Sequence, residues 1–302
     1  MTDPTDHPGF PPTAGPEPTD RANMASVPPQ LDSGIRIISE PSVYLIGKQT
    51  VDDTALEQFL TDHGVSWESD SEVAGEVITE TAGRVCYLSF AKPRPGGNAA
   101  YLTHIKEVGH GSVLEHAVWN LLVTGISRSC SHELVRHRAG WAYSQLSQRY
   151  VDESVAEYVE PDIIANDPEL HAIWLEAVGH SHAAYVKLVE HLNAKLGDAK
   201  TAAAAMVPPN TDKTTRRKTA RQAARSVLPN ATETKIFVTA NARALRHFLE
   251  QRGSEFAEPE IRKLACKFLD ILQKDAPNLF SDYEKKPLPD GTFELVTPYK
   301  KV

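Results

Sequence analysis

The chain has 302 residues, with 32 basic against 40 acidic side chains, a formal net charge of −8 and three cysteines. This length suffices for one large domain or two ordinary ones, and the 41% of hydrophobic residues excludes both a mini-protein and a wholly disordered chain. The cysteines lie far apart and form no CxxC pair, so we exclude a disulfide framework and a thiolate zinc site and expect a reducing, cytoplasmic setting.

Charge and apolar runs limit the partners of the chain. The longest apolar stretch, 117–126, is too short to cross a bilayer, and the N-terminal segment lacks the basic and apolar regions of a signal peptide. A net charge of −8 disfavours general binding to nucleic acid. We therefore expect neither a membrane nor a nucleic acid as a partner.

The first predicted region is a tail without fixed structure. Eight of the 21 prolines fall in the first 30 residues, among Thr, Asp and Gly. Such a segment buries too little apolar surface to offset its ordering entropy. We expect a disordered tail over 1–33 and, since no later linker or repeat stands out, one α+β domain over 34–302.

Strands and helices are predicted throughout the rest of the chain. The first half is predicted to begin with a strand at 35–46, interrupted by Pro41, and a helix at 53–63. Loops at 66–75 and 92–97, a helix at 98–108 and a strand at 115–124 follow. The last predicted element of this half is a helix through Glu133, capped by Ser127 or Ser129. The second half is predicted to contain helices at 168–196, 214–227, 240–252 and 259–274, an Ala-rich segment at 202–209, and strands at 234–239 and within the last 25 residues.

A dense set of hydrogen-bond donors follows the predicted helix through Glu133. The set comprises Arg136, His137, Arg138, Trp141, Tyr143, Ser144, Gln145, Ser147, Gln148, Arg149 and Tyr150. Guanidinium, imidazole and hydroxyl groups together suit phosphate, carbonyl or carboxylate ligands, and a solvated basic turn is the alternative. No neighbour is suited to activate Ser147 as a nucleophile, so we expect Ser147 to bind an anion.

The basic helix at 214–227 is a second candidate surface. Arg217, Arg221 and Arg225 recur at four-residue spacing, with Lys218 one turn from Arg221, and they form one positive stripe. Like charges so arranged repel one another unless an anion is present. One alternative is a solvated face with acidic neighbours. The other is RNA binding, for which the stripe lacks stacking aromatics.

The turn GHGSVLEH offers a third set of candidate residues. His110 and Ser112 lie beside flexible glycines, which suits close approach of a bulky planar ligand and lets His110 assist proton movement near neutral pH. Metal binding is disfavoured, because His110 and His116 lack a third ligand at a recognised spacing. A structural role for His116 stays open.

The predicted helix at 240–252 carries the last set. Asn241 and Arg252 are eleven residues apart and share a face of an ideal helix, whereas Arg243 points elsewhere. Two polar faces on one helix indicate contacts with two different groups, although each residue could also be an ordinary surface residue.

Together these segments resemble the flavin-dependent thymidylate synthases, in particular their actinobacterial members. The family hallmark is an RHR triplet followed at seven or eight residues by a serine, and RHRAGWAYSQLSQRY places eight residues between Arg138 and Ser147. The resemblance runs from about residue 35 to 283, through AGRVCY, VGHGSVLEH, GISRSCSHELVRHR, RQAARSVLPNATET and NARALRHFLEQR.

The resemblance implies an α+β fold with a mixed sheet and packed helices. It also implies a homotetramer with active sites between subunits, bound FAD, and NADPH and 5,10-methylenetetrahydrofolate as co-substrates. The implied reaction is C5 methylation of dUMP to dTMP, in which the folate donates carbon, reduced flavin donates hydride and no enzyme nucleophile attacks the pyrimidine. Residues 34–302 are then the catalytic domain.

The resemblance also implies roles for individual residues. Similar to the family's flavin-binding positions are His110, Ser112, Arg136, His137, Arg138, Asn241, Arg243 and His247. Similar to its nucleotide-binding positions are Arg128, Glu133, Arg136, Gln145, Ser147, Gln148, Arg149, Lys218, Arg225 and Arg252. Arg252 and His110 are expected closest to the chemistry. A fixed Arg252 guanidinium facing the uracil carbonyls favours negative charge developing on the ring.

The chain departs from the family pattern at three places. The spacing from RHR to Ser is the longer of the two forms, Phe256 stands where most members have histidine, and Glu133 replaces a glutamine found in some members. All three bear on the sugar that is recognised, because some relatives in nucleoside-antibiotic pathways methylate UMP. The alternatives are therefore the same chemistry on UMP and, outside enzymes, a nucleotide or RNA binder that uses the basic stripe.

Overall fold

The computed structural model describes residues 35–91, 95–198 and 211–300. The tail predicted at 1–33 and the Ala-rich segment at 202–209 lie outside these ranges, so both stay predictions.

The central element is a four-stranded antiparallel sheet with the order β2-β3-β6-β4. Its strands are β2 (Ser42–Lys48), β3 (Val118–Ser127), β6 (Glu233–Asn241) and β4 (Trp141–Gln145). Two smaller sheets pair β1 (Arg36–Ile38) in parallel with β5 (Glu157–Val159), and β7 (Glu284–Pro287) antiparallel with β8 (Phe293–Val296). The α+β class is confirmed. The resemblance implied a mixed sheet, whereas the central sheet is purely antiparallel and the parallel pair of β1 and β5 forms a sheet of its own.

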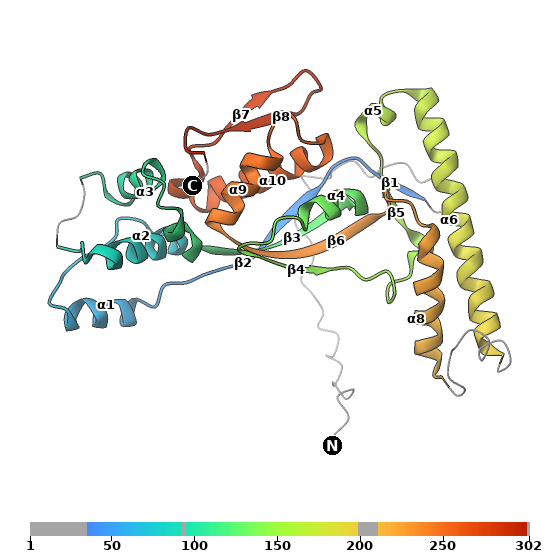
Figure 1. Ribbon diagram of the computed structural model, residues 1–302, viewed down its shortest axis with the longest axis horizontal. Coiled ribbons are helices and arrows are strands. Elements are labelled where there is room, and N and C mark those ends of the chain that lie inside the picture. Colours follow the sequence, from blue (N-terminus) through green and yellow to red (C-terminus); the bar gives the residue numbers. More distant parts are fainter. Residues whose placement is uncertain (1–34, 92–94, 199–210, 301–302) are drawn as a thin grey trace, which may run out of the picture.

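The helices gather in three places around the central sheet (Figure 1). At one end lie α1 (Asp53–Asp62), α2 (Ala74–Tyr87) and α3 (Gly97–Glu107), and at the other lie α6 (Pro168–Gly197) and α8 (Lys213–Ala224). Helices α9 (Ala242–Arg252) and α10 (Pro259–Asp275) pack on one face of the sheet. The short elements are η1 (Gly111–His116), α4 (Arg128–Leu134), η2 (Glu153–Val155), α5 (Asp162–Ala165), η3 (Arg225–Val227) and α11 (Pro277–Phe280).

The core lies between the central sheet and helices α9 and α10. Phe248 and Phe268 of these helices pack against alternate, fully buried residues of β3 and β6, which are Leu121, Val123, Ile236 and Val238. Burial of each such side chain stabilises the fold by roughly 1.5–3 kcal/mol. On the opposite face of the sheet Tyr44 and Ile46 are 52% and 56% exposed. Among the described residues, this face of the sheet therefore carries exposed apolar side chains.

The predicted helices at 53–63, 98–108, 168–196 and 259–274 are confirmed within a few residues. The strand predicted at 115–124 begins only at Val118, because the preceding residues form the 3-10 turn η1. Val113 and Leu114 are consecutive and both buried, which an alternating strand cannot achieve on one face.

Candidate active site

The short helix α4 is the first element of the site. The Ser127 side chain caps it by accepting a hydrogen bond from the Cys130 amide at 3.0 Å. Ser127 also donates through its backbone nitrogen and its hydroxyl to the carboxylate of Glu260 at 2.6 and 2.7 Å. These bonds fix α4 to α10, so that Arg128 stands at the start of α4 and Glu133 in its last turn.

The RHR triplet forms the turn between α4 and β4. The Tyr143 hydroxyl donates to the backbone oxygen of His137 at 2.6 Å, and the Tyr143 ring stacks on Trp141 with centroids 5.7 Å apart. Gly140 has a φ of +74°, and a Cβ there would lie 2.6 Å from the side-chain nitrogen of Asn241. The turn therefore needs glycine at this position.

Helix α9 brings Arg252 to this turn. Asn241 is the last residue of β6 and the N-cap of α9, and its side-chain oxygen accepts from the Ala244 amide at 2.9 Å. The expectation that Asn241 shares a helical face with Arg252 is therefore wrong, because Asn241 still belongs to the sheet. The helix ends at Gly253, where a Cβ would lie 2.5 Å from the carbonyl oxygen of Leu249.

Two side chains hold Arg252 in place. Its Nε donates to Nε2 of His137 at 3.1 Å, and its guanidinium pairs with the Glu133 carboxylate at 2.6 Å. Burial, together with the nearby charges of Arg252 and His247, lowers the pKa of His137 to about 4. His137 is therefore neutral at pH 7, as an acceptor at Nε2 must be. Burial and the neighbouring Glu258 raise the pKa of Glu133, although Arg252 opposes the shift.

The RHR turn and α9 enclose a cavity of about 460 Å³. It is lined by Arg136, His137, Arg138, Ala139, Trp141, His247, Gln251 and Arg252. A second cavity, of about 370 Å³, shares His247 and Gln251 with the first and also includes Arg243. Guanidinium groups beside an aromatic wall suit a ligand that is both planar and anionic.

A second set of cations, here called the cation cluster, consists of two pairs, Arg128 with Arg225 and Arg149 with Lys218, contributed by α4, the loop after β4, α8 and η3. Burial and the charge of Arg225 lower the pKa of Arg128, so these two guanidinium groups are close. Arg149 and Lys218 lie over the Tyr150 ring, 5.6 and 4.8 Å from its centroid. Neighbouring cations repel one another, so this cluster favours an anionic ligand.

The predicted basic stripe is divided in the structure. Arg221 donates to the backbone oxygen of Tyr150 and to the Asp152 carboxylate, both at 2.6 Å, so an acidic neighbour already balances its charge. Arg225 follows the end of α8 and begins η3. The four-residue spacing therefore does not give one continuous surface, because the helix stops before its last cation.

The end of β4 and the loop that follows it hold other predicted nucleotide ligands. Gln145 donates through Nε2 to the hydroxyls of Ser131 and Thr234 at 3.0 and 3.2 Å. The backbone oxygen of Ser147 accepts from the Tyr150 amide at 3.0 Å, and Gln148 is 7% exposed. These contacts make the loop a tight turn leading into Arg149.

Three predicted flavin ligands lie apart from the first cavity. His110 and Ser112 are exposed at the start of η1, where His110 stacks on Tyr87 with centroids 6.4 Å apart. Arg243 pairs with Glu115 at 2.6 Å, and each side chain is 47% exposed. Within one chain, none of the three lines the cavity that contains Arg252, and neither does a fourth predicted flavin ligand, Asn241, which caps α9.

Sequence reasoning missed Gln251 as a residue of the site, and it included Tyr143 among the hydrogen-bond donors without its structural role. Gln251 lines both cavities and lies four residues after His247, a spacing that places both on one face of α9. Tyr143 fixes the backbone of the RHR turn, as described above. Period-four spacing from His247 could have identified Gln251, whereas the hydrogen bond of Tyr143 depends on the tertiary fold.

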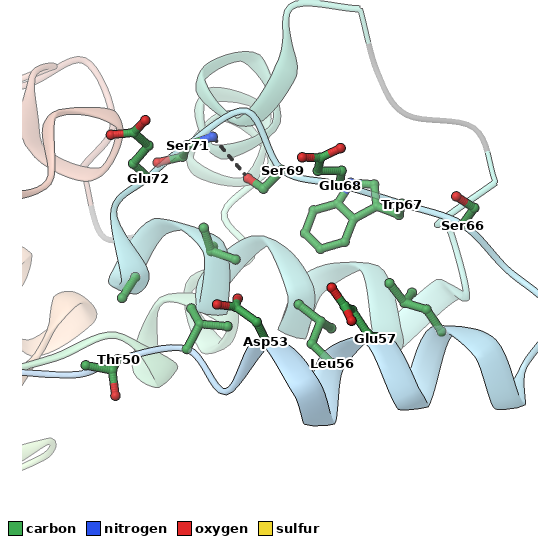
Figure 2. Close-up of a pocket in the computed structure, with 14 residues that line it drawn as sticks. Thr50, Asp53, Leu56, Glu57, Ser66, Trp67, Glu68, Ser69, Ser71 and Glu72 are labelled. Carbon is green, nitrogen blue, oxygen red and sulfur yellow. Dashed lines mark hydrogen bonds between the residues drawn. The ribbon is translucent and has the colours of Figure 1, made fainter.

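Another cavity lies between α1 and α2, far from the RHR turn along the chain (Figure 2). It measures about 820 Å³, and Asp53, Glu57 and Glu68 line it together with Trp67. Carboxylates repel a phosphate, so this cavity does not suit a nucleotide.

Two further findings apply to the part of the chain that the structure describes. No group of three or more His, Cys, Asp or Glu side chains there is arranged to hold a metal ion. No helix in the same ranges combines the length and the apolarity needed to cross a membrane.

Comparisons with known proteins agree with one another. The family model "Thymidylate synthase complementing protein" matches residues 70–278. The chain is 50% identical over 246 residues to the flavin-dependent thymidylate synthase of Mycolicibacterium gilvum, covering 81% of this chain and 93% of that protein. It is 46% identical over 248 residues to the same enzyme of Corynebacterium diphtheriae, covering 81% and 94%.

A solved structure with the same fold was found among the similar proteins. It is the UMP/dUMP methylase PolB from Streptomyces cacaoi bound with 5-Br dUMP, with a TM-score of 0.54 and 18% identity over 81% of this chain and 95% of that chain. The family model covers more than half of the chain, and the relatives match about half of its aligned residues. The chain therefore belongs to the flavin-dependent thymidylate synthase family.

Proposed function

We propose that this enzyme methylates C5 of dUMP to give dTMP, with 5,10-methylenetetrahydrofolate as carbon donor and FAD reduced by NADPH as hydride donor. The observation that carries the proposal is the Arg252 guanidinium, fixed by His137 and Glu133 at the wall of a cavity that carries further cations. Family membership and the names of the relatives support the same reaction.

The residues present fit FAD. Trp141 supplies an aromatic wall, and Arg136, Arg138 and Arg243 supply guanidinium donors that match a pyrophosphate. We assign flavin binding to His110, Ser112, Arg136, His137, Arg138, Asn241, Arg243 and His247. When bound, reduced flavin supplies hydride to the carbon that is being transferred. Neutral His137 can face a flavin without adding a charge, since its pKa is about 4.

The proposed nucleotide ligands divide between the two cation-rich regions. We assign nucleotide binding to Arg128, Glu133, Arg136, Gln145, Ser147, Gln148, Arg149, Lys218, Arg225 and Arg252. The cation cluster would hold the phosphate dianion, and each charge-assisted bond contributes on the order of 1.5–3 kcal/mol. Arg252 would face the uracil carbonyls and stabilise negative charge as C5 becomes nucleophilic. His110 would move a proton near the reacting carbon.

Catalysis without an enzyme nucleophile agrees with the state of the cysteines. Cys130 and Cys266 are buried, and burial raises the pKa of both thiols, so they stay protonated at neutral pH. Cys86 is exposed but does not line the cavity beside Arg252. None of the three thiols is described in a disulfide, which fits the cytoplasmic setting that we propose.

We propose a homotetramer whose active sites are completed between copies of the chain. The sheet face with the exposed Tyr44 and Ile46 supports this, since a second copy would bury these side chains. The separation of His110 and Ser112 from the Arg252 cavity within one chain is a second reason. A neighbouring copy could bring the missing residues to that cavity.

Turnover of dUMP and UMP in parallel tests the proposal. The purified protein should be yellow, and labelled methylene from the folate donor should appear in dTMP. A preference for UMP would establish the alternative substrate, whose ribose differs by one hydroxyl. Colourless protein that transfers no label would overturn the proposal. An RNA binder is disfavoured because Arg221 of its supposed surface is paired with Asp152.

A further inference from the structure

Glu153, which no role above uses, is a buried carboxyl group beside the cation cluster. It begins η2, three residues after Tyr150, and it is 7% exposed. One of its oxygens, Oε1, is buried and has no hydrogen-bond partner. Its backbone nitrogen donates to the Tyr185 hydroxyl of α6 at 3.3 Å, which holds the Glu153 backbone against α6. An unpartnered buried carboxylate oxygen is costly, which calls for an explanation.

The surroundings of Glu153 contain both signs of charge. The groups that face it from the elements packed around it are Asp152 of its own loop, Arg128 of α4, Glu233 and Lys235 of β6, Tyr158 of β5 and Tyr185 of α6. Lys235 is held by Glu233 at 2.9 Å and by Glu157 at 3.4 Å. Lys235 is already shared by Glu233 and Glu157, and Arg128 is the second cation whose charge acts on Glu153.

We propose that Glu153 is a positioning residue that couples binding of the nucleotide phosphate to uptake of one proton. In the free enzyme the Glu153 carboxylate balances the charge of Arg128. When a phosphate dianion binds to Arg128 and Arg225, Glu153 accepts a proton from solvent, so that the phosphate does not meet a buried negative charge. This inference rests on the proposed function of the cation cluster as the phosphate site.

Electrostatics gives the direction and the size of the coupling. Burial and the neighbouring Glu233 raise the pKa of Glu153 to about 7, while Lys235 and Arg128 oppose the shift. When a phosphate dianion binds to Arg128, it neutralises the positive charge that lowers the pKa of Glu153, and it adds negative charge nearby. The pKa of Glu153 must therefore rise further in the complex. A group with a pKa near 7 is partly ionised in the free enzyme, which makes the proton measurable at neutral pH.

Proton uptake can be measured directly by titrating dUMP into the holoenzyme in a calorimeter, in buffers of different ionisation enthalpy. If bound phosphate raises the Glu153 pKa by about one unit from about 7, binding at about pH 7.5 takes up about half a proton per site. The phosphate itself contributes little there, since its second pKa is about 6. The Glu153→Gln variant should bind dUMP with almost no proton uptake.

Glu157→Gln is the matched control. Glu157 is also a carboxyl that contacts Lys235, but it lies on β5, where it pairs with Arg36 at 2.9 Å, and Arg128 is not its partner. This variant should keep the proton uptake of the wild type. A second measurement needs no variant. If binding raises the pKa of Glu153 by about one unit, the Kd of the wild type for dUMP should increase roughly fourfold between about pH 7 and pH 8.5.

The outcomes separate the inference from the proposed function. If the holoenzyme binds dUMP without proton uptake, or if Glu153→Gln takes up as many protons as the wild type, the role of Glu153 is refuted while the nucleotide site stands. If the holoenzyme does not bind dUMP at all, the proposed function fails and the inference fails with it. Uptake in the wild type and in Glu157→Gln, together with its loss in Glu153→Gln, supports the coupling.

Discussion

Replacing Arg252 by Lys tests the part of the site closest to the proposed chemistry. The Arg252 guanidinium contacts His137 through Nε at 3.1 Å and Glu133 through a terminal nitrogen at 2.6 Å. A lysine has one nitrogen and can keep only one of these bonds, most simply the ion pair with Glu133. The nitrogen is then no longer fixed by His137, and the planar pair of donors proposed for the uracil carbonyls is lost.

The size of the effect follows from the donors that are lost. Removal of one preorganised donor to developing negative charge typically costs roughly 2.7–4 kcal/mol, or about 10²–10³ in kcat. We expect Arg252→Lys to lower the kcat for dTMP formation by this factor, with a smaller change in KM for dUMP, because the cation cluster that would bind the phosphate is unchanged.

The assay is dTMP formation at saturating dUMP and folate donor, with the flavin absorbance and the thermal midpoint measured on the same samples. Arg36→Lys is the control, since Arg36 also forms a carboxylate pair, with Glu157 at 2.9 Å, but lies on β1. The control should keep its turnover. If Arg252→Lys turns over as fast as the control and keeps its flavin, the need for a planar guanidinium is refuted.

Three further changes have defined outcomes. Gly253→Ala would place a Cβ 2.5 Å from the Leu249 carbonyl oxygen, so the end of α9 must move. We therefore expect a lower thermal midpoint, a loss of about 1–3 kcal/mol in stability, and reduced turnover. An unchanged midpoint would contradict this expectation. Ser127→Ala removes the cap of α4 and a hydrogen bond to Glu260. The free energy of unfolding, measured with urea, should fall by about 1–2 kcal/mol. A decrease smaller than the error of that measurement would argue against the cap. In the wild type, the raised pKa of Glu153 means that its contribution to stability is fully present below about 4.5 and is lost as the pH rises through about 7. Glu153→Gln should therefore be more stable than the wild type by on the order of 1–3 kcal/mol at about pH 8 but not at about pH 4.5, and equal differences at both values would contradict the shift.

Local signals in the sequence predicted most elements of the fold. The candidate cap at Ser127 predicted where α4 begins, and helical periodicity from Pro168 predicted α6, because both signals lie in the local sequence. A turn at 109–116 was predicted, but its continuation through His116 in place of a strand from 115 was not, since the burial of both Val113 and Leu114 depends on packing against helices α2 and α9 from other parts of the chain. Local pattern also did not show that β6 continues to Asn241.

The candidate site was predictable in its residue types and only partly in its geometry. The clustering of Arg136, His137 and Arg138 indicated an anion site, and the structure places all three with Arg252 at one cavity. The bond between Arg252 and His137 joins residues 115 positions apart, and no spacing rule predicts it. The unpartnered oxygen of Glu153 is likewise a property of tertiary packing.

The most direct test of the proposed reaction is a single turnover of the flavoenzyme after reduction by NADPH. On mixing with dUMP and methylene-labelled tetrahydrofolate, the flavin should return to its oxidised absorbance as an equivalent amount of labelled dTMP appears. The label should end in the C5 methyl group. If the flavin stays reduced, or if it is oxidised without transfer of the label to the pyrimidine, the account of this protein as a flavin-dependent thymidylate synthase is contradicted.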